Sequence, residues 1–135
     1  MIYVKHAEGV KLASEALADH VAVLVERFGV NLVCVESNMG GDLWKQVFAN
    51  LPCRLLLHRH NSGSSKEHRA GQAFDLYKKQ KVKHLQRFSR LEEQMLAFPK
   101  VRHDDILDAV CNGILLFKNN SGGRVMATQR RYAEV

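Results

Sequence analysis

Long hydrophobic runs, paired cysteines and a nucleotide-binding glycine motif are all missing from this sequence. No apolar run approaches the roughly 20 residues that a membrane-spanning helix needs, and the N-terminus lacks the pattern of a signal peptide. Cys34, Cys53 and Cys111 are isolated from one another, which argues against a zinc site built on cysteine. Three buried thiols in a reducing cytoplasm are the simplest expectation.

A phosphate-binding loop of the form Gly-x-x-x-x-Gly-Lys-Ser/Thr occurs nowhere, so the chain is expected to have no ATP site. What is present is a chain of 135 residues, 46% of them hydrophobic and 25% charged. These values are ordinary for one soluble globular domain. The net charge of +6 favours a polyanionic partner, chiefly nucleic acid, although a merely cationic surface would have the same charge.

The hydrophobic periodicity alternates between strands and helices along the chain. Strands are expected at 2–4, 30–36, 53–58 and 81–85, and helices at 14–28, 42–50, 65–80, 89–98 and from 103 or 104 to 118. Alternation of this kind predicts an α/β fold with a mainly parallel sheet flanked by helices. Ligands then gather beyond the carboxyl ends of the strands. We therefore expect one domain over 1–118 and a flexible basic tail over 119–135.

Local signals set the expected helix boundaries and one buried face. Asp42 is expected to cap the second helix, and Ser64 with Glu67 and Ser89 with Glu92 have the spacing of capping boxes. The final helix is expected to bury one apolar stripe, formed by Ile106, Val110, Gly113, Ile114 and Phe117.

Glu36 is the first candidate for a chemical role. It ends the apolar run Val33-Cys34-Val35, where a charge is costly unless something pairs with it. The carboxyl end of a central strand is also where an α/β site is expected. A solvated carboxylate at a strand end is the competing interpretation, and for this residue alone it is favoured.

Three aspartates at the start of the final helix form the second candidate. Asp104, Asp105 and Asp108 are spaced three and four apart on a helix, so their side chains are neighbours. Crowded carboxylates repel one another, and Mg²⁺ or Mn²⁺ relieves that repulsion. Asp104 and Asp105 could instead only stabilise the helix dipole, whereas Asp108 lies beside the apolar stripe.

Lys66 and Arg69 are the third candidate, because they fall on one turn near a predicted helix N-terminus. Cations and free N–H groups at such a position can hold a phosphate. Taken alone the signal is weak, since basic residues on a helix are usually solvated.

Together these segments resemble the nuclease domain of the large terminase subunit, the DNA-packaging motor of tailed phages. The matching motifs are Val33-Cys34-Val35-Glu36-Ser37-Asn38 with Gly40-Gly41, Lys66-x-x-Arg69, Leu76-Tyr77, Val82-Lys83-His84, Leu91-Glu92-x-Gln94-Met95 and His103-Asp104-Asp105-x-x-Asp108-Ala109. Each motif is weak by itself, but the ordered set is fairly specific and extends over about 2–117.

The resemblance implies an RNase H-like fold and a metal-dependent endonuclease that cuts concatemeric double-stranded DNA with two ions of Mg²⁺ or Mn²⁺. It implies that Glu36, Asp105 and Asp108 are catalytic and that Asp104 joins them as a metal ligand. Lys66 and Arg69 are implied to contact phosphate. Double-stranded DNA, other terminase chains, the small terminase subunit and the portal are the implied partners, in the bacterial cytoplasm.

One departure from the family concerns the beginning of the fold. The family opens with a strand that carries an essential Asp and then a second strand, whereas Ile2-Tyr3-Val4 resembles the third. The expectation is an N-terminally truncated RNase H-like domain without the ATPase domain, which binds at least one ion more weakly. A non-catalytic DNA-binding or assembly remnant of a prophage terminase stays open as an alternative. So does another RNase H-like nuclease, such as a fragment of a junction resolvase or transposase.

Overall fold

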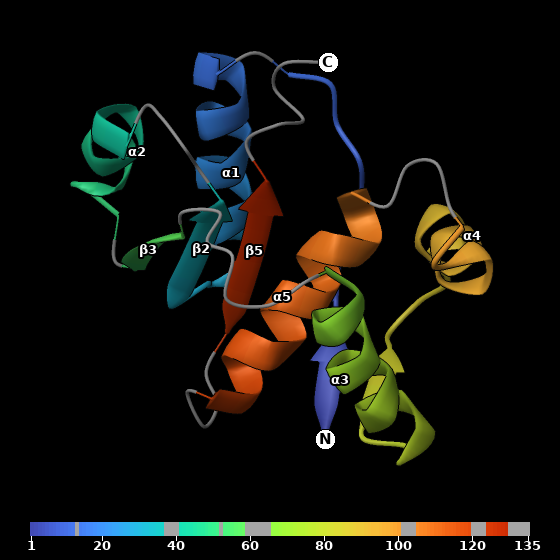
Figure 1. Cartoon of the computed structure of the whole chain (residues 1–135). Helices are drawn as coiled ribbons and strands as arrows, with labels where there is room; N and C mark the ends of the chain where they lie inside the picture. The colour runs from blue at the N-terminus through green and yellow to red at the C-terminus, as the bar shows by residue number, and fades with distance from the viewer. Residues whose placement is uncertain are drawn as a thin grey trace.

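The computed structural model describes residues 1–12, 14–36, 41–51, 53–58, 66–100, 105–119 and 124–129. Helices and strands alternate through most of these ranges, as the periodicity predicts (Figure 1). In chain order they are β1 (Ile2–Val4), α1 (Ser14–Phe28), β2 (Leu32–Glu36), α2 (Gly41–Phe48), β3 (Arg54–His58), α3 (Lys66–Lys78), β4 (Val82–His84), α4 (Ser89–Ala97), α5 (Asp105–Asn119) and β5 (Val125–Gln129).

The strands form two parallel sheets. One has the order β3-β2-β5 and the other pairs β1 with β4, and every described pair is parallel. The expected α/β fold with parallel sheets and flanking helices is therefore confirmed. In the larger sheet β2 is central, and its last residue Glu36 is level with His58 on β3 and Gln129 on β5.

The expectation of a flexible tail is wrong for Val125–Gln129, which form β5 and pair with β2 along its whole length. A side-chain contact leads into this pairing, because the Arg124 N–H donates to Asn31 Oδ1 at 3.0 Å. The run is short and follows a polar stretch, so its pairing depends on a strand more than 90 residues earlier in the chain. Residues 120–123 and 130–135 of the expected tail lie outside the described residues.

Two of the expected helix caps are also wrong. Helix α2 begins at Gly41, so Asp42 is its second residue and does not precede it. Helix α4 has Phe88 at its N-cap position without a side-chain cap, so Ser89 and Glu92 form no capping box. Glu92 instead lies 3.5 Å from Arg87. Packing of the buried Phe88 ring, which is 7% exposed, outweighs the local capping preference. Ser64, of the other expected capping box, lies outside the described residues.

The apolar residues form two core clusters, one on each side of the molecule. The first joins β1, β4, α3, α4 and α5, and the second joins α1, α2 and β2. Helix α5 lies between the two sides of the molecule, because it packs on α3 and α4 and also contacts β5 of the larger sheet (Figure 1). It therefore has more than one buried face, and the expected stripe is only partly right. Ile106 and Ile114 are buried as expected, together with Leu107, Asp108 and Cys111, whereas Val110, Gly113 and Phe117 are half-buried.

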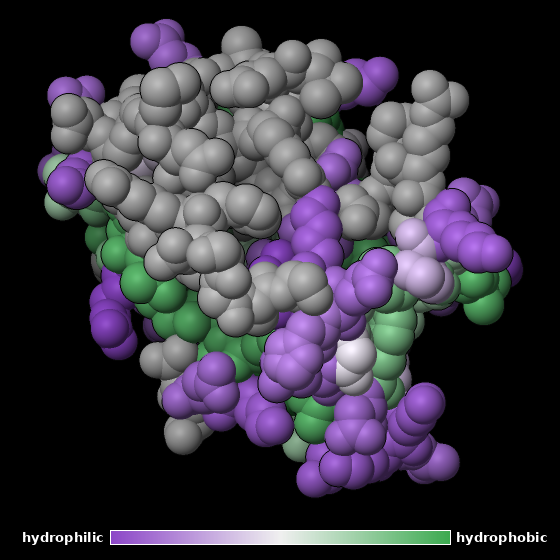
Figure 2. All heavy atoms as spheres, in the orientation of Figure 1, coloured by the Kyte–Doolittle hydropathy of each residue, from purple (hydrophilic) through white to green (hydrophobic). Residues whose placement is uncertain are grey.

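Helix α3 is strongly polar on its outer side, and Figure 2 shows hydrophilic side chains gathered over it at the lower right. Its buried residues are Ala70, Ala73 and Leu76. Small residues at a helix contact allow close approach of the partner helix, and α3 packs directly on α5. The close contact matters because it positions the amino-terminal turns of both helices against each other.

The expectation of three buried thiols is confirmed only for Cys111, since Cys34 and Cys53 are half-buried. All three are free cysteines. Within the ranges that the structure describes, no helix has the length and apolar character needed to cross a membrane.

Candidate functional site

Three elements begin or end at one end of the larger sheet. The carboxyl ends of β2 and β5 and the amino terminus of α5 all lie at the end that is uppermost in Figure 1. Glu36 is the last residue of β2, as expected, and its backbone is paired with both neighbouring strands. The description of Glu36 covers its backbone but not its side chain, and Asp104 lies outside the described residues.

The first turn of α5 carries the other two acidic candidates. Asp105 begins the helix and is half-buried, and Asp108 follows one turn later with only 4% of its side chain exposed. The turn is held by a residue from α4, because the Leu107 N–H donates a buried hydrogen bond of 2.9 Å to Gln94 Oε1. One of the N–H groups that a helix start leaves without an intrahelical partner is satisfied in this way.

Lys66 and Arg69, from the first turn of α3, reach the same place. Arg69 Nη2 lies 3.4 Å from Asp108 Oδ1, and Lys66 Nζ lies 4.0 Å from Asp108 Oδ2. Arg69 is 13% exposed and Lys66 27% exposed, so Lys66 is the more accessible cation. The structure therefore brings together two groups of residues that the sequence placed 39 positions apart.

Burial also makes the neighbouring thiol inert. Cys111 lies one turn beyond Asp108 on α5, and burial raises its pKa to about 12, with the nearby Asp108 charge adding to the shift and Arg69 opposing it. The thiolate is the reactive form of cysteine, so Cys111 acts as a packing residue beside the acidic group.

The described residues do not by themselves complete a metal centre. Among them, no group of three or more His, Cys, Asp or Glu side chains is arranged to hold an ion. Asp108 already has two cationic neighbours. Asp105 and Asp108 are thus the acidic candidates whose side chains the structure describes, and carboxylate oxygens are the donors that hard divalent cations prefer.

Two polar features were missed by the sequence reasoning. Gln94 belongs to one of the sequence motifs, but no role was expected for it. The signal that could have identified it as buried is its position three residues after Leu91, on the same face of α4. The second is a cluster around His84, whose ring nitrogen lies 2.7 Å from the Tyr77 hydroxyl and whose ring packs on Phe88. Burial lowers the pKa of His84, and Glu92 opposes this shift. No sequence signal identified that cluster, because its members come from different elements.

Comparison with known families gives one match over most of the chain. The family described as the terminase RNaseH-like domain matches residues 10–117. This range includes β2, α3 and all but the last two residues of α5, the elements that contribute the acidic and basic candidates. Comparisons with curated proteins and with solved structures found no match.

Proposed function

This chain belongs to the family of terminase RNase H-like domains, and from that premise we propose that it is a metal-dependent endonuclease module that cuts concatemeric double-stranded DNA during viral DNA packaging. The observation that supports the proposal is the arrangement of three element ends: the first turns of α5 and α3 are in contact, and the carboxyl end of β2 lies at the same end of the larger sheet as the amino terminus of α5 (Figure 1). They carry an acidic residue, an acidic pair and a basic pair.

The acidic residues are assigned to the metal. Carboxylate oxygens are preferred by Mg²⁺ and Mn²⁺, and Glu36, Asp104 and Asp105 are the residues that would hold these ions. Two bound ions would supply an activated water and stabilise the leaving oxygen of the phosphodiester. This chemistry calls for acidic residues on separate elements, as β2 and α5 provide.

The basic residues are assigned to the DNA phosphate. Lys66 and Arg69 belong to the amino-terminal turn of α3, and the first N–H groups of a helix, which have no intrahelical acceptor, also favour an anion. Asp108 lies against the Arg69 guanidinium at 3.4 Å and restricts its position. We therefore assign Asp108 chiefly to positioning Arg69, as a helper of the metal site.

Cleavage of supercoiled plasmid in Mn²⁺, in Mg²⁺ and in EDTA tests the proposal. Metal-dependent nicking should be lost in Glu36→Ala and in Asp105→Ala. It should persist in Asp75→Ala, a matched control on α3 whose carboxylate is 58% exposed and paired with Lys79. Nicking that survives Glu36→Ala and Asp105→Ala in the same preparation shows that the assignment of these residues is wrong.

A non-catalytic DNA-binding or assembly module is the second candidate. It is favoured by the two cations beside Asp108, because a carboxylate that already faces Lys66 and Arg69 needs no metal ion to offset its charge. A folded chain that does not nick DNA but binds it with steeply salt-dependent affinity would support this function. Affinity that is indifferent to salt would count against it.

Substrate and partners separate the remaining alternatives. Preference for a four-way junction over linear or supercoiled duplex would indicate another RNase H-like nuclease. Binding to other terminase chains, to the small terminase subunit or to the portal is expected if the module works in packaging. Pull-down of each purified component tests these partners separately.

A further inference from the structure

The two sheets are separated by a gap between β1 and β5. β5 is at the edge of its sheet and pairs with β2 on one side, and β1 pairs with β4 on one side. Helix α5 contacts both β1 and β5 and so connects the two sheets (Figure 1). In the part of the chain that the structure describes, each of these strands thus has one edge without a strand partner.

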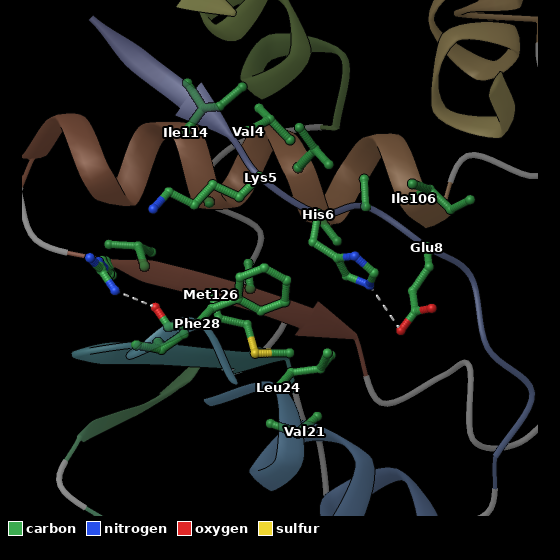
Figure 3. Close-up of a pocket in the computed structure, with 18 of the residues that line it drawn as sticks. Val4, Lys5, His6, Glu8, Val21, Leu24, Phe28, Ile106, Ile114 and Met126 are labelled. Atoms are coloured by element: carbon green, nitrogen blue, oxygen red, sulfur yellow. Dashed lines mark hydrogen bonds and ion pairs between the residues drawn. The ribbon is translucent and has the colours of Figure 1, made fainter. Parts of the chain in front are cut away.

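A cavity of about 230 Å³ occupies this gap. It is lined by β1 and the following 5–10 segment, by α1, by α5 and by β5, and most of its lining side chains are apolar. Ile106, Ile114, Met126 and Phe28 surround it in Figure 3. An engineered cavity of roughly 150 Å³ holds a benzene molecule, so this cavity has room for more than one apolar side chain.

The backbone of β1 presents hydrogen-bonding groups away from β4. The Ile2 N–H donates to Lys81 O at 2.8 Å, and Val4 O accepts from the Leu85 N–H at 3.0 Å. Ile2 and Val4 therefore face β4. Because backbone groups of successive strand residues point to opposite sides, the N–H and C=O of Tyr3 point away from β4.

The backbone of β5, on the other side of the cavity, also presents hydrogen-bonding groups away from its partner strand. Arg124 O accepts from the Leu32 N–H at 3.2 Å, which directs Arg124 toward β2. By the same alternation, the backbone groups of Val125 and Ala127 point away from β2. Tyr3, Val125 and Ala127 all line the cavity, so an extended chain placed there finds donors and acceptors on both sides.

The charges around the cavity favour an acidic occupant. Lys5 and Arg124 both line it and are exposed. The acidic lining residue, Glu8, lies 3.2 Å from His6 Nε2 (Figure 3). It also contacts His20. Burial raises the pKa of Glu8, but the hydrogen bond with His20 and the contact with His6 outweigh burial and leave the pKa below its ordinary value. The Glu8 carboxylate is therefore engaged by neighbouring imidazoles, whereas Lys5 and Arg124 add positive charge.

We propose that the cavity between β1 and β5 accepts an extended segment of a partner polypeptide, with apolar side chains at alternate positions and acidic residues at its ends. The segment adds as a β-strand to the two edges and joins the two sheets into one. Main-chain hydrogen bonds supply affinity in this mode of recognition, and alternate side chains enter pockets and supply specificity. The proposal is independent of nuclease activity, because it involves neither DNA nor a metal.

The probe is a peptide of alternating valine and threonine with two glutamates at each end, added to the full chain. Fluorescence anisotropy measures its affinity, and hydrogen–deuterium exchange locates it. The backbone amides of Tyr3, Val125 and Ala127 should become protected. The same peptide with N-methylated amides, or with lysine in place of glutamate, should bind about tenfold more weakly or worse, because edge hydrogen bonds or charge complementarity are lost.

A matched pair of protein variants tests the cavity itself. Ala109→Leu places a larger side chain in the cavity wall and should weaken peptide binding about tenfold. Ala97→Leu makes the same change at an exposed position of α4 and should leave binding unchanged. The proposal is overturned if the peptide protects neither strand at about 1 mM. It is also overturned if N-methylation has no effect, or if the two variants bind the peptide equally.

Discussion

Removing the charge of the buried Asp108 should destabilise the fold far more than removing the charge of Asp75, which forms a shorter ion pair at the surface. In Asp108→Asn the side chain keeps its size and loses its charge, and Arg69, only 13% exposed, loses the carboxylate 3.4 Å away. Coulomb's law gives about 5 kcal/mol for two unit charges at that distance with an effective dielectric constant near 20. Residual solvent at Arg69 and the second cation Lys66 reduce this value.

Breaking a buried ion pair by removing one partner costs roughly 3–5 kcal/mol, because the other charge stays buried without compensation. With partial exposure of Arg69 we expect the lower end of that range, about 3 kcal/mol. For a chain of this length the loss corresponds to a fall in Tm of roughly 10 °C. Asp108→Leu combined with Arg69→Met should recover part of the loss, because the more buried of the two cations is then removed together with its partner, while Lys66 is 27% exposed and keeps access to solvent.

Urea unfolding followed by circular dichroism measures the effect, with Asp75→Asn as the control. Asp75 has the shorter contact, 2.9 Å to Lys79, but both side chains are 58% exposed, so no change in the unfolding midpoint is expected there. If distance alone set the energy, Asp75→Asn would cost more than Asp108→Asn. Equal midpoints for the two variants would refute the assignment of Asp108 as a buried, stabilising partner.

Four further predictions concern individual positions in the structure. Gln94→Leu should lower the free energy of unfolding by about 1–3 kcal/mol, because the buried Leu107 N–H loses its acceptor. Gly29→Ala should destabilise by about 1 kcal/mol or more, because Gly29 has a φ of 60°, where a side chain is strained. Gly71→Ala, by contrast, should stabilise by roughly 0.5–1 kcal/mol, because its helical position has open space for a Cβ. His84 should make stability fall as pH drops below 6.5, its ordinary pKa, because burial lowers its folded-state pKa and the unfolded chain takes up the proton first.

Each of these predictions has its own check by urea unfolding. Gln94→Glu retains an acceptor oxygen and should cost less than Gln94→Leu, and the reverse order would contradict the capping role. Equal changes for the two glycine variants would show that backbone conformation does not decide their effects. His84→Gln cannot titrate, so it should flatten the change in stability between about pH 7.5 and pH 5.5. An unchanged pH dependence in that variant would assign the effect to other groups.

The local sequence pattern was sufficient to predict most helices and strands, because the residues that favour each element lie within a single segment of the chain. The β-branched run around Val33 and Val35 predicts a buried strand, and both residues are fully buried in the structure. The helix expected over 14–28 ends at Phe28, and the positive φ of the next residue, Gly29, is the conformation that ends a helix. The expected cap at Ser89 failed because packing of the buried Phe88 outweighs a preference of about 1 kcal/mol. The expected cap at Asp42 failed because α2 already begins at Gly41.

The sequence by itself determined the α/β class, the order of the elements and the family, because apolar periodicity and ordered motifs are properties of neighbouring residues. Only the tertiary structure decided that Val125–Gln129 join β2 and that Asp108 lies against Arg69. It alone also placed Gln94 at the start of α5. These contacts join residues far apart in the chain, and their energy depends on burial. Burial arises only when α3, α4 and α5 pack together, so no local pattern contains it.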